Sequence, residues 1–262
     1  MREFLRSFAI QRRVLGALIM RETYTRYGRD NLGFAWLFAE FLIFALPVIV
    51  MWHFIRGKYE HGGLLVVPFA WSGYLPILLF RHLGAHALRG IRLNMALLYH
   101  RNVTPFDVVA ARMIVEIAGN YGAAVFSFVF LYIIGQMIWP HDMPLLFLGY
   151  AYMTWWCVAV GLIIAAFSER SALFEKIWPP ISYMYLPVSG FFYLAAWAPA
   201  GVRSTLLAIM PALPCYEMIR GGIFGPIIHV YYNIPQLTLT LAGLTAFGLL
   251  GMRDVHRFLV NE

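Results

Sequence analysis

The chain has 262 residues, of which 61% are hydrophobic and only 13% are charged, and its mean hydropathy is +0.69. Soluble domains carry about 25% charged residues, so this composition excludes an ordinary soluble protein and indicates an integral membrane protein. In a soluble chain the net charge of +7 would suggest nucleic-acid binding. In a membrane protein it is explained by the orientation of the chain, so we expect no nucleic-acid partner.

Residues 1–31 precede the first long apolar run and carry seven arginines. Leu5, Phe8 and Leu15 fall on one side of a helix, whereas several arginines gather on another side. This pattern is typical of a helix that lies in the membrane interface. We therefore expect an amphipathic interface helix over 1–31, with a plain topology anchor as the alternative.

Six further segments are apolar enough to cross a bilayer, which takes about 20 helical residues. They are too long and too uniformly apolar for a transmembrane β-barrel, whose strands are short and alternate. The sequence therefore predicts an all-α transmembrane domain over residues 32–262, with spans at 32–55, 64–84, 113–139, 143–167, 177–198 and 234–252.

The positive residues are distributed unevenly between the two sides of this predicted bundle. With six spans both termini lie on one side, and that side receives sixteen of the twenty Lys and Arg residues. Cytoplasmic loops carry an excess of positive residues. We therefore expect a multi-pass protein with both termini in the cytoplasm.

Two connecting segments have a special character. Residues 199–233 are apolar but contain four prolines, and proline interrupts a helix, so we expect short helices that re-enter from the outer face between spans five and six. A surface hairpin of helices is the alternative. Residues 81–112 join the second and third spans and predict either a short helix that docks a partner or a solvated loop. Thr104, Pro105 and Asp107 form a helix start signal there.

The sequence lacks the motifs of the common catalytic classes. It contains no Walker A motif, no HExxH, no GxSxG and no Asp-x-Asp pair. His82 and His86 are four residues apart, but no third ligand lies near them in the sequence, so we expect no metal site. The chain is therefore expected not to be an enzyme and to bind no cofactor itself.

Glu40 and Glu116 place carboxylates inside predicted spans. Ionisable groups at this depth normally face the interior of a bundle and find partners. Pairing with Arg81 or Arg112 is the expected arrangement, and a proton relay is the alternative.

Aromatic residues make up 17% of the chain, and many lie well inside the spans rather than at their ends. Flat rings offer platforms for sugar rings, so these residues are candidates to line a carbohydrate channel. Ordinary helix packing would also place aromatic residues there. The candidates are Trp71, Tyr74, Tyr183, Tyr185, Phe191, Phe192, Tyr193 and Trp197.

Three stretches carry a resemblance to a known family: "RRVLGALIMRETYTRYGRDNLGFAWLFAE", "HRNVTPFDVVAAR" and "YEMIRGGIFG". They are similar to the permease subunit of ABC-2 type polysaccharide exporters, in particular to capsular polysaccharide export inner-membrane proteins. The resemblance covers essentially the whole chain and implies a protein of the bacterial inner membrane. It also implies a homodimer that exports lipid-linked capsular polysaccharide through a channel between the two copies.

The resemblance further implies several partners. Two copies of a separate ATPase would bind ATP and Mg²⁺, and a periplasmic polysaccharide co-polymerase and outer-membrane export proteins would complete the route. The expected ATPase contacts are Arg12, Arg13, Arg21, Arg26, Leu97, Leu98, Tyr99, His100, Arg101, Ser168, Glu169 and Arg170. The expected cytoplasmic mouth contains Arg89 and Arg92, and the expected outer gate contains Arg220, Gly221 and Gly222.

Other functions remain compatible with parts of the sequence. An O-antigen or teichoic-acid permease would share the same architecture. A proton-coupled secondary transporter would use Glu40 and Glu116. A membrane-embedded glycosyltransferase would require the acidic pair that the sequence lacks.

Overall fold

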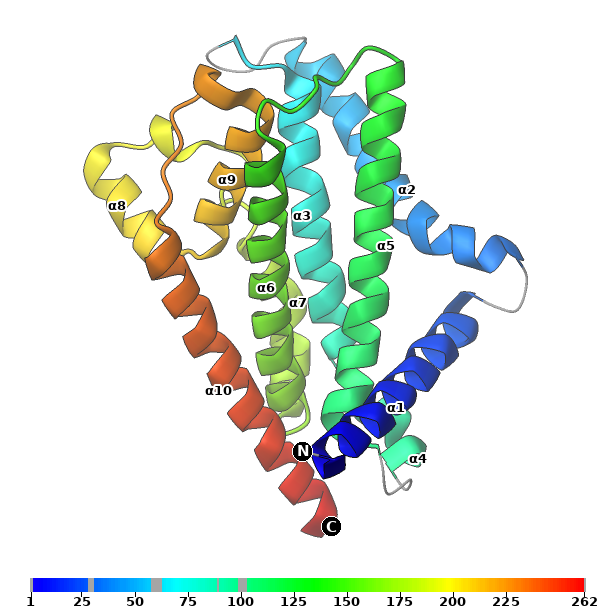
Figure 1. Cartoon of the computed structure of the whole chain (residues 1–262). Helices are drawn as coiled ribbons and strands as arrows, with labels where there is room; N and C mark the ends of the chain where they lie inside the picture. Colours follow the sequence, from blue (N-terminus) through cyan, green and yellow to red (C-terminus); the bar gives the residue numbers. More distant parts are fainter. Residues whose placement is uncertain (1, 28–30, 58–62, 89, 99–102, 262) are drawn as a thin grey trace.

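The computed structural model describes the backbone of residues 2–27, 31–57, 63–88, 90–98 and 103–261, and within these ranges it leaves out the side chains of 2–8, 26–27, 31–35, 37, 56 and 256–261. The described chain is helical and contains no β-strand. Its long helices form one bundle, and both termini lie at the same end of it (Figure 1). We call this end the terminal end.

The helices follow one another along the chain without forming a repeated unit. The described α-helices are α1 (Arg2–Tyr27), α2 (Asn31–Arg56), α3 (Val66–Ala87), α4 (Met95–Leu98), α5 (Pro105–Ile133), α6 (Met143–Ser168), α7 (Ala172–Met184), α8 (Ala200–Ile209), α9 (Ala212–Phe224) and α10 (Ile234–Asn261). Short 3-10 turns lie between them at η2 (Arg92–Asn94), η3 (Ala195–Trp197) and η4 (Gly225–Ile227).

Helix α3 lies at the centre of the bundle. It packs against α2, α5 and α6, and all but one of its residues from Val66 to Phe80 are buried. Helices α9 and α10 both pack against α6, and α1 runs obliquely along the terminal part of α5 (Figure 1). The core is therefore built around two protein-facing helices, α3 and α6.

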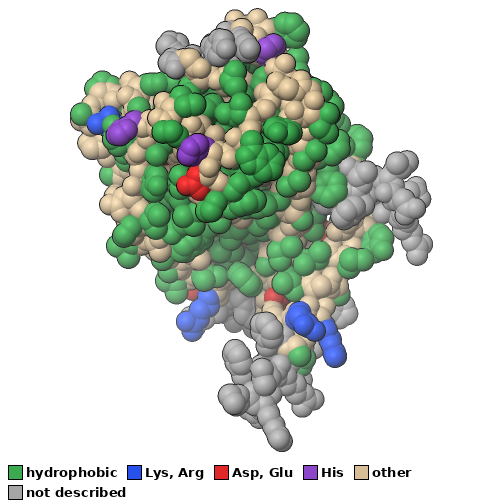
Figure 2. Space-filling model, turned by 45° about the horizontal axis from the view of Figure 1, so that its top comes forward, with side chains coloured by type: hydrophobic (Ala, Val, Ile, Leu, Met, Phe, Trp, Pro, Cys, Tyr) green, Lys and Arg blue, Asp and Glu red, His purple; other side chains and the backbone are tan. Residues whose placement is uncertain are grey.

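Four helices among the described residues are long and apolar enough to cross a membrane. The candidate spans are Phe38–Ile55 within α2, all of α5, all of α6, and Ile234–Val255 within α10. Hydrophobic side chains cover most of the face shown in Figure 2. An apolar outer surface suits a lipid environment, in which helices satisfy their own backbone hydrogen bonds. The chain is therefore an all-helical integral membrane protein.

Most of the predicted spans correspond closely to helices. The predictions 32–55, 143–167 and 234–252 fall on α2, α6 and the first part of α10, and 64–84 falls on α3. Helix α3 has 22 residues but is less apolar than the four candidate spans, because its last two turns contain an arginine and two histidines.

The predicted third span, 113–139, is displaced along the chain relative to α5. The hydroxyl of Thr104 accepts from the Asp107 N–H at 3.3 Å, and the Asp107 carboxylate accepts from the Thr104 N–H at 2.9 Å. With Pro105 in the first turn, this capping box starts the helix eight residues before the apolar run alone would suggest. The start signal read from the sequence is thus confirmed, and the span boundary is corrected.

The predicted fifth span, 177–198, is not one continuous helix. Helix α7 ends at Met184, and turns follow it as far as Gly190, which has a φ of +94°. Pro179 and Pro180 lie inside α7 and supply no N–H donors, and the left-handed conformation at Gly190 is one that glycine adopts easily. The prediction of one span over 177–198 was wrong, because the apolar run continues across a turn that ends the helix.

Residues 199–233 form the short helices α8 and α9 and the turn η4, as the prolines predict. Every residue of α9 is buried, and the helix packs closely against α6. A Cβ atom at Gly222 would lie 2.6 Å from the backbone nitrogen of Leu146, so only glycine fits this contact.

We expect Gly222→Ala to lower the thermal stability of the purified protein, because the added methyl group must displace α9 from the backbone of α6. Overpacking of this kind costs about 1–3 kcal/mol. The matched control is Gly243→Ala on α10, where nothing lies within 4 Å of the added atom and stability should stay level or rise. Equal melting temperatures for the two variants, measured by scanning fluorimetry in detergent, would contradict the close α6–α9 contact.

Candidate functional site at the terminal end

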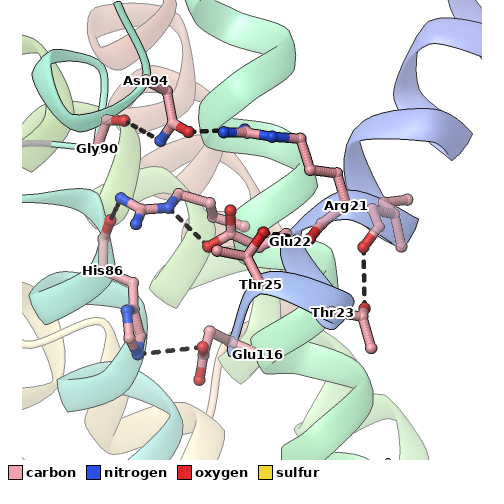
Figure 3. Close-up of polar contacts among 10 residues, drawn as sticks. Arg21, Glu22, Thr23, Thr25, His86, Gly90, Asn94 and Glu116 are labelled. Carbon is pink, nitrogen blue, oxygen red and sulfur yellow. Dashed lines mark hydrogen bonds and ion pairs between the residues drawn. The ribbon is translucent and has the colours of Figure 1, made fainter. Parts of the chain in front are cut away.

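A network of ion pairs and hydrogen bonds joins several segments at the terminal end (Figure 3). On α5, Arg112 donates from Nε to Oε1 of Glu22 on α1 at 2.9 Å. The same arginine donates from Nη1 to the backbone oxygen of His86 on α3 at 3.0 Å. The side chains of Arg112 and Glu22 are only 13% and 10% exposed, so solvent screens this pair weakly. One arginine therefore holds α1, α3 and α5 together.

A second set of contacts joins α1 to the segment that contains η2 and α4. Arg21 donates to Oδ1 of Asn94 at 2.9 Å, and Nδ2 of Asn94 donates to the backbone oxygen of Gly90 at 2.9 Å (Figure 3). Nearer the N-terminus of α1, the side chain of Gln11 contacts Asp107 in the first turn of α5. Helix α1 is thus attached to the bundle along much of its length.

A third set of contacts joins η2 to the turn between α6 and α7. Arg92 Nε lies 3.1 Å from Oε2 of Glu169, and Arg92 also donates from Nη2 to the backbone oxygen of Glu169 at 2.8 Å. Glu175, in the first turn of α7, lies 3.7 Å from the same guanidinium. Burial raises the pKa of the Glu169 carboxyl, while the N–H group and the charge of Arg92 pull that pKa down.

The turn between α6 and α7 also contacts α10. Nη2 of Arg170 lies 3.3 Å from the Asp254 carboxylate and donates to the backbone oxygen of Gly251. Both charged side chains are well exposed, so this pair stabilises the contact only weakly. Ser168 is buried, and its hydroxyl donates within α6 to the backbone oxygen of Ala165 at 3.1 Å.

These contacts define one mechanical unit, which we call the terminal network: Gln11, Arg21, Glu22, Arg92, Asn94, Asp107, Arg112, Glu169 and Glu175. Directional polar contacts connect α1, the η2–α4 segment, α5 and the α6–α7 turn.

The structure brings together some of the residues proposed as ATPase contacts and leaves others apart. Arg21 and Glu169 belong to the terminal network, as does Arg92, which was assigned to the cytoplasmic mouth. Arg12 and Arg13 are exposed on α1, and Leu97 and Leu98 are half-buried at the end of α4. Arg89, Tyr99, His100 and Arg101 lie outside the described residues, as does the side chain of Arg26.

Sequence reasoning did not predict several members of the terminal network. Glu22, Asn94 and Arg112 were not assigned to the site, although each contacts a segment distant in the sequence. Glu22 gave one signal, because it is a carboxylate within an arginine-rich helix. Its partner could not be read from the sequence, since Arg112 lies 90 residues later.

The aromatic residues proposed for a channel fall into two groups. Trp71 and Phe191 are buried inside the bundle, where Nε1 of Trp71 donates to the Ser127 hydroxyl at 2.9 Å. In this chain they contribute to packing. Tyr183, Phe192 and Trp197 are partly exposed, although each ring also contacts a side chain within the chain. The other candidates are partly buried: Tyr74, Tyr185 and Tyr193.

The residues proposed for an outer gate are buried in α9 at the opposite end of the bundle. Arg220 donates to the backbone oxygens of Gly190, Phe191 and Tyr193 at 2.8, 2.5 and 2.6 Å. Its guanidinium lies 4.0 Å from the centre of the Phe69 ring. Gly221 and Gly222 follow it in the same buried helix. The Arg220 side chain therefore attaches the segment after α7 to α9, and we call this set of contacts the Arg220 joint.

The two carboxylates inside the spans lie near histidines of α3. Glu116 is fully buried, with one oxygen 3.1 Å from Nε2 of His86 and the other 3.3 Å from Nδ1 of His82. An oxygen of Glu40 lies 4.0 Å from the same nitrogen of His82. Arg81 and Arg112, the expected partners of these carboxylates, make their described contacts with other groups. Arg81 contacts the Tyr183 hydroxyl, and Arg112 pairs with Glu22. The expectation that His82 and His86 have no third ligand nearby was wrong, because α5 brings Glu116 to them.

Comparison with known proteins finds relatives along nearly the full chain. No model of a protein family matches it. The chain is 38% identical over 246 residues to the capsule polysaccharide export inner-membrane protein CtrC of Neisseria meningitidis serogroup B, covering 94% of this chain and 92% of the relative. It is 36% identical over 257 residues to the capsule polysaccharide export inner-membrane protein BexB of Haemophilus influenzae, covering 97% and 95%. A more distant relative, 22% identical over 66% of each chain, is the polysialic acid transport protein KpsM of Escherichia coli.

Proposed function

Since the chain belongs to the family of capsule polysaccharide export inner-membrane proteins, we propose that it is the membrane subunit of an ATP-driven exporter of lipid-linked capsular polysaccharide. Two copies would form the channel, and two copies of a separate ATPase would bind ATP and Mg²⁺. The names of the relatives favour capsular polysaccharide over O-antigen or teichoic acid as the cargo. A periplasmic co-polymerase and outer-membrane export proteins would receive the polymer.

In this proposal the chain crosses the inner membrane six times, with both termini in the cytoplasm. Helices α2, α3, α5 and α6 supply the first four crossings. Helix α7 with the segment after it supplies the fifth, and α10 supplies the sixth. The excess of arginine in the segments at the terminal end supports this orientation. Several Lys and Arg side chains gather toward the lower part of the view in Figure 2.

The observation that carries the proposal is the terminal network. ATP hydrolysis on a separate subunit can drive transport only if its motion reaches the spans. The contacts of Arg92 with Glu169, of Arg21 with Asn94 and of Arg112 with Glu22 give such motion a rigid route into α1, α5 and α6. Solvent-exposed apolar side chains on η2 and α4, namely Leu93 and Met95, offer a surface for the ATPase.

The first test is purification of the full chain from its native membrane in mild detergent, followed by mass identification of the proteins that accompany it. A stoichiometric partner with a Walker A motif is expected. If export into vesicles requires a proton gradient and no ATPase, the proposal fails and a secondary transporter that uses Glu40 and Glu116 replaces it.

We expect Leu93→Glu to reduce ATPase co-purification by about tenfold or more, because an unpaired carboxylate buried in an apolar contact costs more than the roughly 1.4 kcal/mol that corresponds to a tenfold change. Leu93 is 69% exposed, so the variant should keep the melting temperature of the wild type. The matched control is Val202→Glu, also an exposed apolar residue but on α8 at the opposite end, which should retain the ATPase. Undiminished ATPase binding by Leu93→Glu would remove η2 from the proposed contact surface.

A further inference from the structure

Three side chains with metal-binding groups converge where α3 meets α5. His82 and His86 project from α3 and Glu116 from α5, and one ligand atom of each lies within 4.8 Å of the other two. Figure 3 shows His86 and Glu116 directed at each other. The side chain of Glu116 has no exposed surface, so its carboxylate is not one of the solvated charges common on protein surfaces. Nothing in the proposed transport function calls for this cluster.

The spacing of the two histidines suits a metal ion. Residues four apart lie on the same face of a helix, and zinc-binding helices present two imidazoles in this way. Ligand atoms around a tetrahedral zinc ion lie about 3.3 Å apart, given bonds of about 2.0–2.1 Å. Glu116 places one oxygen 3.1 Å from Nε2 of His86 and its other oxygen 3.3 Å from Nδ1 of His82, so a carboxylate that binds through both oxygens has about that spacing to each histidine. With one ligand atom from each residue, all three atoms lie within 4.8 Å of one another, so the set would need to close by at most about 1.5 Å to reach tetrahedral spacing.

Neighbouring groups hold these ligands in place. The ring of Phe41 on α2 stacks on the His82 ring with centroids 4.4 Å apart. The backbone oxygen of His86 accepts a hydrogen bond from Arg112, which fixes the last turn of α3. These contacts limit the movement of the His82 ring and of the helix turn that carries His86.

A pocket gives an ion access to the cluster. It has a volume of about 340 Å³, and its lining includes Glu40, Arg81, His82, His86 and Tyr183. Glu40 lies 4.0 Å from His82, so its carboxylate or a water molecule can occupy a fourth position on the pocket side. Two imidazoles and one carboxylate are a known donor set for zinc.

We propose that His82, His86 and Glu116 bind one divalent transition-metal ion of the zinc type. The ion would hold α3 to α5 beside the contact of Arg112 with Glu22. The proposal does not depend on transport, because it concerns binding to the isolated chain.

The test uses the full-length protein purified with an affinity tag that contains no histidine, stripped with a chelator and then freed of it. Co²⁺ is titrated first, because four-coordinate cobalt absorbs visible light, and Zn²⁺ is then added as a competitor. One Co²⁺ per chain and its displacement by Zn²⁺ are expected. Zn²⁺ should also raise the melting temperature, since a ligand that binds the folded state stabilises it.

Substitutions assign the binding to the cluster. His82→Gln and His86→Gln are each expected to weaken Co²⁺ binding by about 100-fold or more, above the loss seen for outer contacts. The matched control is His229→Gln, which lies outside the cluster and should bind as the wild type does. If Glu116→Gln does not fold, His86→Gln decides the matter, because the His86 side chain is 31% exposed and tolerates a change.

The proposal is overturned if the wild type binds less than one Co²⁺ per chain, since the cluster would then consist of ion pairs alone. It is equally overturned if His86→Gln binds as tightly as the wild type, or if His229→Gln loses binding.

Discussion

Arg220→Met is expected to lower the free energy of unfolding by about 3–5 kcal/mol, which is typical when one partner of a buried charged network is removed. The guanidinium is fully buried and donates to three backbone oxygens of the segment after α7. Methionine fills similar space but leaves those oxygens without these donors. Glu217, one turn earlier, would lose a nearby positive charge while still accepting from the N–H groups of Ala195 and Tyr231.

The measurement is thermal unfolding of the purified protein in detergent, where a decrease of roughly 6 °C or more is expected for a chain of this size. Arg220→Lys should recover only part of the loss, because an ammonium group lacks the fork that reaches several carbonyls. Arg203→Gln is the matched control. Arg203 lies over the Tyr231 ring at 4.1 Å and is only partly buried, so its loss should cost less than about 1 kcal/mol. A wild-type melting temperature for Arg220→Met would show that the segment does not depend on this joint.

Arg220 also illustrates what the sequence could not reveal. The resemblance to exporter permeases implied that Arg220 belongs to an outer gate, whereas the structure buries its side chain inside the bundle. The three oxygens that bind Arg220 lie 27 to 30 residues earlier in the chain. Their position depends on the interruption between α7 and η3. The apolar run continues through that interruption, so hydropathy predicted one span across the two segments.

Continuous hydrophobic runs predicted α2, α6 and α10 well, because length and hydropathy alone decide whether such a segment forms a membrane helix. The family could also be recognised from the sequence, and the full-length relatives confirm it. The partners of Glu22 and of His82 could not be predicted in the same way. Both contacts depend on how far α5 is shifted along its neighbours, and the capping box at Thr104 sets where that helix begins.

Arg112→Gln is the second change with a large expected effect, because this side chain joins α1, α3 and α5. The pair with Glu22 is mostly buried, so removing the arginine leaves a carboxylate in a poorly solvated position. We expect a loss of about 3 kcal/mol in the free energy of unfolding. If the proposed function holds, ATPase co-purification should persist while capsule export falls, since the ion pair that couples α1 to α5 would be lost although the contact of Gln11 with Asp107 remains.

A double-mutant cycle separates this contact from general damage to the fold. Glu22→Gln combined with Arg112→Gln replaces both charges by amides, which can still bond to each other. The double variant should therefore be more stable than the sum of the single losses predicts, by about 1–3 kcal/mol. Arg13→Gln, on an exposed part of α1, is the matched control for loss of positive charge and should leave stability within about 0.5 kcal/mol of the wild type. If the two single losses are strictly additive, the 2.9 Å contact between Arg112 and Glu22 does not couple α1 to α5. Motion of the ATPase would then have to reach α5 through another contact.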